Sequence, residues 1–414
     1  MSDEVASERT ARLSAMAVVA ALVCGLGFAL HGSLDSVQYQ PHSDDGYYLR
    51  YMQDVSQRGL GALPEQFTFY LSETRHWIFP PPSRVGFTLA CALWSELFGA
   101  SLRAISLLSM VSHLALVVVS FAFALRWTSP LRAVGVAALM GFSTLHLGLS
   151  RLALTDVFIS LVQVASIGLF IEYLRAPERR GRAIAFAVVF GFAMLTKEIS
   201  VLLALPFAGC AALARWGERR AVPVLRTVAI LVLPGLACAL GWWLAAGDLT
   251  TVWRVMKIVL LSPGTNEYAL QFGSGGWFRY PIDELLMSPW TTLLGLGGVA
   301  LALWRWRRGD LDLIAVSLSL VYIAQVGVLG LFTKNLRYVA VLEFPLRFLA
   351  AGLIWDLCAA ERSARGRVLA AAVALILCAF AWSDYDRLWL EFRLYDPVTG
   401  ALVIGREMAP RPPQ

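Results

Sequence analysis

The chain consists largely of apolar stretches long enough to cross a lipid bilayer, and this leaves few folds open to it. Of its 414 residues, 58% are hydrophobic and only 15% are charged, with a mean hydropathy of +0.63. A soluble core does not need that much apolar sequence. In hydrocarbon every backbone polar group must bond within the protein, and apolar windows of about 20 residues suit α-helices. The sequence therefore predicts an all-α polytopic membrane protein.

About eleven such windows define the expected transmembrane helices. They lie near residues 13–32, 104–125, 132–149, 153–174, 183–196, 199–214, 224–246, 290–304, 312–332, 338–357 and 368–382. Short arginine-rich segments between them mark the cytoplasmic side by the positive-inside rule. These segments are residues 126–132, 175–182, 215–226, 304–308 and 361–367. The N-terminus is then cytoplasmic. The first window is expected to be a retained span, because no small-residue cleavage site lies near its end.

The expected organisation is one transmembrane domain, residues 1–382, followed by a short extracytoplasmic tail, residues 383–414. Its two large extracytoplasmic loops are residues 33–103 and 247–289. The second of these is dense in glycine, so we expect a non-regular loop that is either a cover for a site or a plain linker.

The first large loop is expected to contain interfacial helices. Residues 80–99 begin with three prolines and are apolar enough to be counted as a span, but a crossing there would invert every later arginine-rich segment. We therefore expect a helix that lies in the outer interface. A second, shorter interfacial helix is expected at residues 54–61.

Two adjacent carboxylates, Asp44 and Asp45, follow the first apolar window on the outer side. An ionised carboxylate costs about 2.5–3.5 kcal/mol at the centre of a transmembrane helix, so the pair indicates either an aqueous site at the interface or a solvated turn. The chain's three lysines, Lys197, Lys257 and Lys334, lie on or near the same side, against the positive-inside rule. Their placement calls for a second explanation, such as holding an anion.

The net charge of +6 does not indicate nucleic acid as a partner, because the arginines form short clusters between apolar windows instead of one basic face. The six cysteines show no paired spacing, so neither a zinc site nor a disulfide framework is indicated.

Four motifs, taken in order, resemble the GT-C superfamily of lipid-linked glycosyltransferases. They are the acidic pair, a helix that follows prolines and ends in Leu97-Phe98-Gly99, the segment from Ser150 to Asp156, and Leu195-Thr196-Lys197-Glu198. The pattern is most similar to the bacterial branch that contains protein O-mannosyltransferases and the aminoarabinose transferase of lipid A. It covers roughly residues 10–215.

The resemblance implies transfer of a sugar from a polyprenyl phosphate to a glycan, lipid or protein acceptor on the outer face of the bacterial inner membrane. Carried over by position, Asp44 and Asp45 match the catalytic acidic pair, and Arg151, Asp156 and Lys197 match substrate-binding positions. A carboxylate can take the proton of the acceptor hydroxyl.

The chain departs from the family pattern at two places. No basic residue stands directly before Pro80, so Arg75, His76 or Arg84 would have to substitute for it. Glu198 replaces a usual glycine, and this carboxylate is positioned to pair with Lys197.

The departing phosphate is an anion that needs cations, and Lys334 and Arg337 are further candidates to supply them. No protein-bound cofactor is indicated, although an acidic site of this kind is compatible with a divalent cation.

Some of these residues also have structural interpretations. Arg151 suits a helix cap or a snorkelling side chain, and Asp156 suits the positive end of the next helix. A transporter or flippase for a lipid-linked or anionic substrate is the alternative function, because it too needs many spans and some buried charge.

Overall fold

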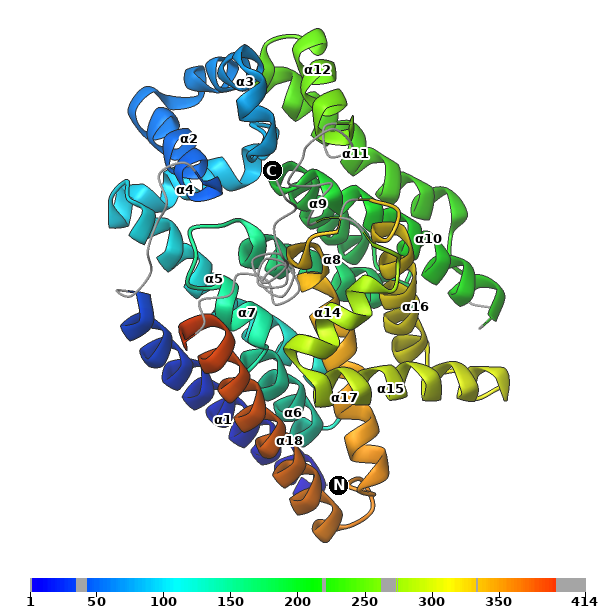
Figure 1. Ribbon diagram of the computed structural model, residues 1–414. Coiled ribbons are helices and arrows are strands. Elements are labelled where there is room, and N and C mark those ends of the chain that lie inside the picture. The colour runs from blue at the N-terminus through cyan, green and yellow to red at the C-terminus, as the bar shows by residue number, and fades with distance from the viewer. Residues whose placement is uncertain are drawn as a thin grey trace, which may run out of the picture.

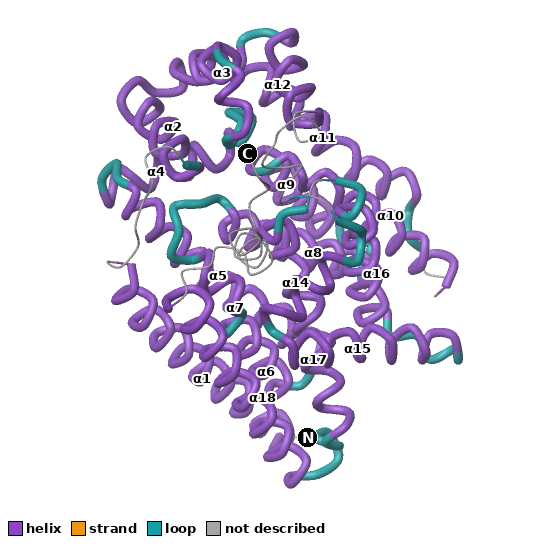
Figure 2. The backbone as a smooth tube through the Cα atoms, viewed as in Figure 1, coloured by secondary structure: helices purple, strands orange, loops and turns teal. Residues whose placement is uncertain are grey.

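The computed structural model describes residues 2–34, 43–217, 221–261, 273, 275–332 and 334–391 (Figure 1). Within these ranges helices joined by loops and turns make up the structure, and there is no strand, as Figure 2 shows. The prediction of an all-α fold is therefore confirmed.

Seven helical segments are long and apolar enough to cross a membrane: Ser7–Leu34, Leu102–Trp127, Asp156–Arg175, Glu198–Gly217, Val224–Ala246, Leu336–Leu357 and Ala364–Glu391. Shorter apolar helices are Val85–Phe98, Pro130–Gly141 and Leu313–Leu329. Every expected span falls on helical structure, while the number of crossings stays a prediction.

The helices that build this architecture are α1 (Ser2–Leu34), α2 (Asp44–Arg58), α3 (Leu63–Ser72), α4 (Val85–Phe98), α5 (Leu102–Trp127), α6 (Pro130–Gly141), α7 (Thr144–Leu149), α8 (Asp156–Arg175), α9 (Arg180–Thr196), α10 (Ala204–Ala212) and α11 (Val224–Ala246). They continue with α12 (Leu249–Leu261), α14 (Arg279–Met287), α15 (Pro289–Arg307), α16 (Leu313–Leu329), α17 (Glu343–Leu357) and α18 (Ala364–Tyr385). The short 3₁₀ turns η1 (Gly59–Ala62), η2 (Thr74–Ile78), η3 (Glu198–Leu203) and η6 (Leu336–Leu342) connect some of them.

Burial separates central helices from peripheral ones. In the most apolar window of each span, 89% of residues are buried for η6 with α17 and 78% for α8, but only 22% for α1 and for α11. Apolar side chains on the outside of a bundle suit lipid, so α1 and α11 present broad lipid-compatible faces. The central helices α8 and α17 carry the buried polar groups Asp156, Glu343 and Arg347.

The arginine-rich segments gather at one end of the bundle. Two contacts join these segments directly: Ser129 to Glu361 at 2.9 Å, and Arg226 to the Pro177 carbonyl at 2.6 Å. Two more join them to the nearby ends of α8 and α17: Trp127 to Glu172 at 2.8 Å, and Arg305 to Asp356 at 2.9 Å. Segments expected on one side of the membrane are thus neighbours in space. In Figure 1, α2, α3, α4 and α12 lie at the end far from the N-terminus.

The structure corrects three local expectations. The interfacial helix expected at residues 54–61 instead begins at Asp44, so the acidic pair forms the first turn of α2 and is not a solvated turn between elements. The expected non-regular loop 247–289 is helical at both ends, in α12 and α14, and residues 262–272 and 274 lie outside the described residues.

The third correction concerns two expected boundaries. The span expected at 132–149 breaks at Phe142 and Ser143, between α6 and α7, where the Ser143 hydroxyl caps α7. The tail expected from residue 383 instead continues α18 to Tyr385 and one further turn to Glu391. Residues 392–414 lie outside the described part.

Gly86 allows α4 to pack closely on the end of α9. A Cβ atom at this position would lie 2.7 Å from the Thr196 hydroxyl and 3.0 Å from the Thr196 backbone nitrogen. Contacts this short require the backbone to move. The close approach matters because Arg84 directly precedes α4 and Glu198 lies two residues after the end of α9.

We expect Gly86→Ala to lower the free energy of unfolding by about 1–3 kcal/mol, because the added methyl overpacks the α4–α9 contact. Gly61→Ala is the matched control, since a Cβ atom there has no neighbour within 4 Å. Thermal unfolding of both variants in the same detergent checks this. Equal stability of the two variants would show that the contact is not tight.

Candidate active site

Five chain segments bring charged residues together at one place. Asp44 and Asp45 come from the first turn of α2, and Asp156 comes from the first turn of α8. Carboxylates are favourable there, because helix N-termini carry partial positive charge. The cations come from three other segments: Arg84 precedes α4, Lys197 follows α9, and Arg337 lies in η6.

Asp156 links two of the cations. Its side chain is 1% exposed, and its Oδ1 lies 2.6 Å from Lys197 Nζ. Its second oxygen lies 3.5 Å from Arg337, whose guanidinium also donates to Asp44 at 2.8 Å. The Lys197 ammonium lies 5.0 Å from the centre of the Tyr338 ring, a cation–π distance.

A second ion pair joins the first loop to the bundle. Arg84 Nη2 donates to Glu198 at 3.0 Å, and Arg84 also donates to the Tyr48 hydroxyl. The backbone just before it is held too, because Trp242 donates to the Ser83 carbonyl at 2.8 Å. The expected pairing of Lys197 with Glu198 is therefore wrong, since each has a partner from another segment.

Asp45 differs from its neighbour. In the described part of the chain its carboxylate takes part in no ion pair or hydrogen bond, whereas the Asp44 carboxylate pairs with Arg337. The pKa of Asp45 is raised to about 6, mainly by burial and then by the charge of Asp44, while Arg337 acts in the opposite direction. A carboxyl with this pKa is a base near neutral pH.

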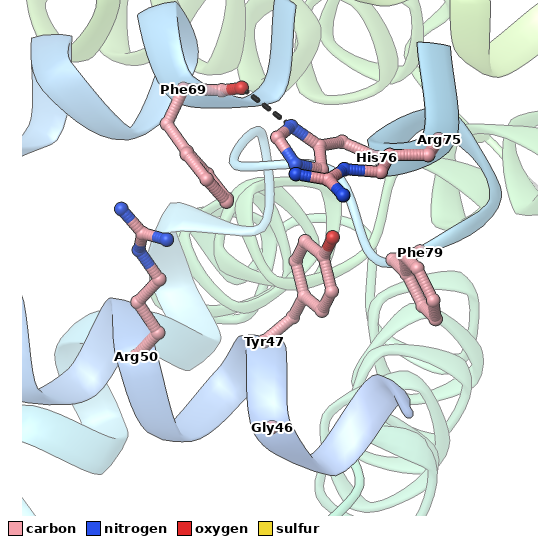
Figure 3. A pocket seen from close by; sticks show the side chains of 7 residues that line it. All are labelled: Gly46, Tyr47, Arg50, Phe69, Arg75, His76 and Phe79. Carbon is pink, nitrogen blue, oxygen red and sulfur yellow. Dashed lines mark hydrogen bonds between the residues drawn. The ribbon is translucent and has the colours of Figure 1, made fainter. Parts of the chain in front are cut away.

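The remaining expected site residues lie elsewhere. Arg151 donates to the Ser33 carbonyl at 2.9 Å, so it contacts the end of α1. The backbone N–H of Lys334 donates to the Gly273 carbonyl at 2.8 Å, while its side chain forms no ion pair with the described residues. Arg75 and His76 line a separate pocket beside α2, shown in Figure 3.

The sequence did not predict three members of the charged cluster. These are Tyr48, Tyr338 and Glu198, which pairs with Arg84. Tyr48 follows the acidic pair by one helical turn, so its position along α2 was the available signal. Among the basic candidates for the position before the prolines, Arg84 is the one that reaches this cluster.

No group of three or more histidine, cysteine or carboxylate side chains suited to a metal ion occurs among the described residues. The Arg337 guanidinium already lies beside both Asp44 and Asp156, where a metal ion would otherwise bind. What the cluster can do chemically is present a base, Asp45, beside guanidinium groups that attract an anion.

The described fold and site define a polytopic helical membrane protein with a charged centre at one end of its bundle. No protein family model and no curated protein matches the sequence. Among the solved structures that are similar to it, two cover most of its length. ArnT from Cupriavidus metallidurans bound to undecaprenyl phosphate matches with a TM-score of 0.57 and 17% identity, covering 94% of this chain and 74% of ArnT.

The Archaeoglobus fulgidus oligosaccharyltransferase in the apo form matches with a TM-score of 0.61 and 13% identity, covering 91% of this chain and 55% of that protein. The chain thus spans about half the length of the archaeal enzyme. The chain therefore shares the fold of these two proteins, as the resemblance implied. Its superfamily and branch stay predictions.

We expect Lys197→Ala to destabilise the protein by about 3–5 kcal/mol, because it removes the ammonium group that pairs with the buried Asp156 carboxylate. Lys257→Ala is the control, since Lys257 is exposed on α12. Thermal unfolding compares them. Replacing both partners, Lys197→Met with Asp156→Leu, should recover part of the loss; no recovery would show that the ion pair is not the cause.

Proposed function

We propose that the protein is a membrane glycosyltransferase that moves a sugar from a polyprenyl phosphate to an acceptor on the extracytoplasmic face. The observation that carries the proposal is a carboxyl with a raised pKa, Asp45, beside the Arg337–Asp44 pair at the outer end of a GT-C fold. The structural similarity to ArnT, solved with undecaprenyl phosphate, supports this class of donor.

Asp45 is the proposed base. The acceptor hydroxyl oxygen attacks C1 of the sugar, its proton passes to the Asp45 carboxylate, and the bond between C1 and the phosphate oxygen breaks. The polyprenyl phosphate leaves with the electron pair of that bond. A base in hydrogen-bond reach contributes roughly 10²–10⁴-fold to such a step.

Arg337 is the proposed phosphate ligand. Its side chain is 19% exposed, and its present partner Asp44 is 23% exposed, so an anion can reach both. Lys197 is only 4% exposed and lies against Asp156. We therefore assign Lys197 to orienting Asp156, and Arg337 with Arg84 to stabilising the charge on the departing phosphate.

The proposed location is the bacterial inner membrane, with the N-terminus and the arginine-rich segments in the cytoplasm. A transporter or flippase remains the alternative from another class. The concentration of charge at helix ends around one acidic pair supports transfer chemistry, because transporters place their sites near the midplane between repeated halves.

We expect Asp45→Asn to abolish sugar transfer, because an amide cannot accept the proton. In the unmodified protein the rate should fall as the pH drops below about 6, where Asp45 becomes protonated. The initial rate of transfer, measured across pH, checks both expectations. An unchanged rate for Asp45→Asn would remove this residue from the chemistry.

Stability provides the control for the same variant. A carboxyl whose pKa is raised on folding favours the folded state below its unfolded pKa and loses that contribution as the pH rises through about 6. Asp45→Asn lacks this loss, so its melting temperature at pH 7 should equal or exceed that of the unmodified protein. An inactive variant with a lower melting temperature would instead indicate misfolding.

The orientation is tested by labelling single cysteines with a membrane-impermeant maleimide on intact spheroplasts. Thr68→Cys on α3 should react, and Arg362→Cys in the arginine-rich segment 361–367 should react only after the membrane is opened, because the two positions are proposed to lie on opposite sides. Both positions are exposed. The reverse pattern would invert the topology and place the charged centre in the cytoplasm.

A further inference from the structure

Asn335 stands directly before the helical segment Leu336–Leu357 and contacts Arg337 at two points. The side-chain oxygen of Asn335 accepts a hydrogen bond from the Arg337 backbone N–H at 3.0 Å. The same oxygen accepts another from Arg337 Nε at 3.4 Å. The first bond caps the 3₁₀ turn η6, and the second is made by the guanidinium of the charged cluster. One oxygen thus joins the start of the helix to the cluster.

The Nε contact affects where the rest of the guanidinium points. A guanidinium is planar and its donors have a fixed geometry, so holding one nitrogen restricts the directions of the other two. With Nε beside Asn335, Nη1 of Arg337 lies 2.8 Å from Asp44 and 3.5 Å from Asp156. An arginine that is already oriented loses less side-chain freedom when it binds an anion.

Asn335 is itself held by the second large outer segment. Its backbone N–H donates to the hydroxyl of Tyr280 at 3.3 Å, and Tyr280 is a fully buried residue of α14. The preceding residue is held too, because the Lys334 backbone N–H donates to the Gly273 carbonyl at 2.8 Å. The outer segment therefore sets the position of Asn335, and Asn335 passes this constraint to Arg337.

Capping alone does not require asparagine at this position. Serine caps a helix about as well as asparagine does, and Ser143 and Ser363 cap α7 and α18 in this protein. The serine hydroxyl ends one bond closer to the backbone than the asparagine oxygen. It can cap the turn, but it falls short of Arg337 Nε, which is already 3.4 Å from the Asn335 oxygen.

We propose that Asn335 is a positioning residue that holds the Arg337 guanidinium toward Asp44, where the proposed function places the donor phosphate. Asn335 acts through Arg337 and not through a contact of its own with the donor. Tyr280 supports it from α14. The role of the phosphate rests on the proposed function, whereas the orientation of Arg337 does not.

The first test titrates the purified full-length protein with undecaprenyl phosphate and measures the Kd by native mass spectrometry. Asn335→Ser and Asn335→Ala should both raise the Kd about 3- to 10-fold, because each removes the acceptor that holds Arg337 Nε. Thermal unfolding should separate the same two variants. Asn335→Ala should melt at a lower temperature because the cap is lost, and Asn335→Ser should melt close to the unmodified protein.

Ser363→Ala is the matched control. The Ser363 hydroxyl caps α18 at the opposite end of the bundle, where it accepts from the Gly366 backbone N–H at 2.9 Å. This variant should melt at a lower temperature and keep the Kd of the unmodified protein. Asn335 would be a cap and nothing more if Asn335→Ser bound undecaprenyl phosphate as tightly as the unmodified protein, or if Ser363→Ala weakened binding equally.

A double-mutant cycle tests the orientation of Arg337 without any ligand. Asp44→Asn removes the partner of Arg337 and should lower the melting temperature. The decrease should be smaller when Asn335→Ser is also present, because a displaced guanidinium gains less from Asp44. An equal decrease in both backgrounds would overturn the proposal.

The same cycle separates this proposal from the proposed function. Suppose that it shows the coupling of Asn335 to the Asp44–Arg337 pair, while Arg337→Gln and the unmodified protein have the same Kd for undecaprenyl phosphate. Asn335 then still positions Arg337, and the assignment of Arg337 to the donor phosphate is the part that fails.

Discussion

The buried carboxylate of Asp156 is the interaction on which the charged centre depends. A buried charge without partners costs several kcal/mol, so this side chain requires both Lys197 and Arg337. Because the two cations come from the end of α9 and from η6, the carboxylate joins three separate parts of the bundle. Arg337 extends the same network to Asp44 and thereby holds the start of α2.

The segment from α2 to α4 is therefore a structural part of the bundle and not an appendage. The Arg84–Glu198 pair and the close packing at Gly86 attach α4 to α9, while the Asp44–Arg337 pair attaches α2 to η6. The two faces of α2 then have different surroundings. One face meets the charged cluster, and the other forms a wall of the pocket in Figure 3.

Sequence patterns predicted the helical class, the position of each apolar segment and the acidic pair, because these depend on local composition and on motif order. The ion pairs could not be predicted in the same way. Lys197 and Asp156 are 41 residues apart, Arg84 and Glu198 are 114 apart, and Arg337 and Asp44 are 293 apart. Sequence reasoning paired Lys197 with its immediate neighbour, since only tertiary packing shows which distant helix ends meet.

The balance of charge in the centre has a consequence for the proton that the proposed reaction releases. Asp44, Asp45, Asp156 and Glu198 lie among three cations, Arg84, Lys197 and Arg337, so the cluster is electroneutral only while Asp45 holds its proton. An ionised Asp45 gives the cluster one net negative charge. In the proposed enzyme, the proton that leaves the acceptor hydroxyl restores neutrality, so the charge balance of the cluster favours its capture.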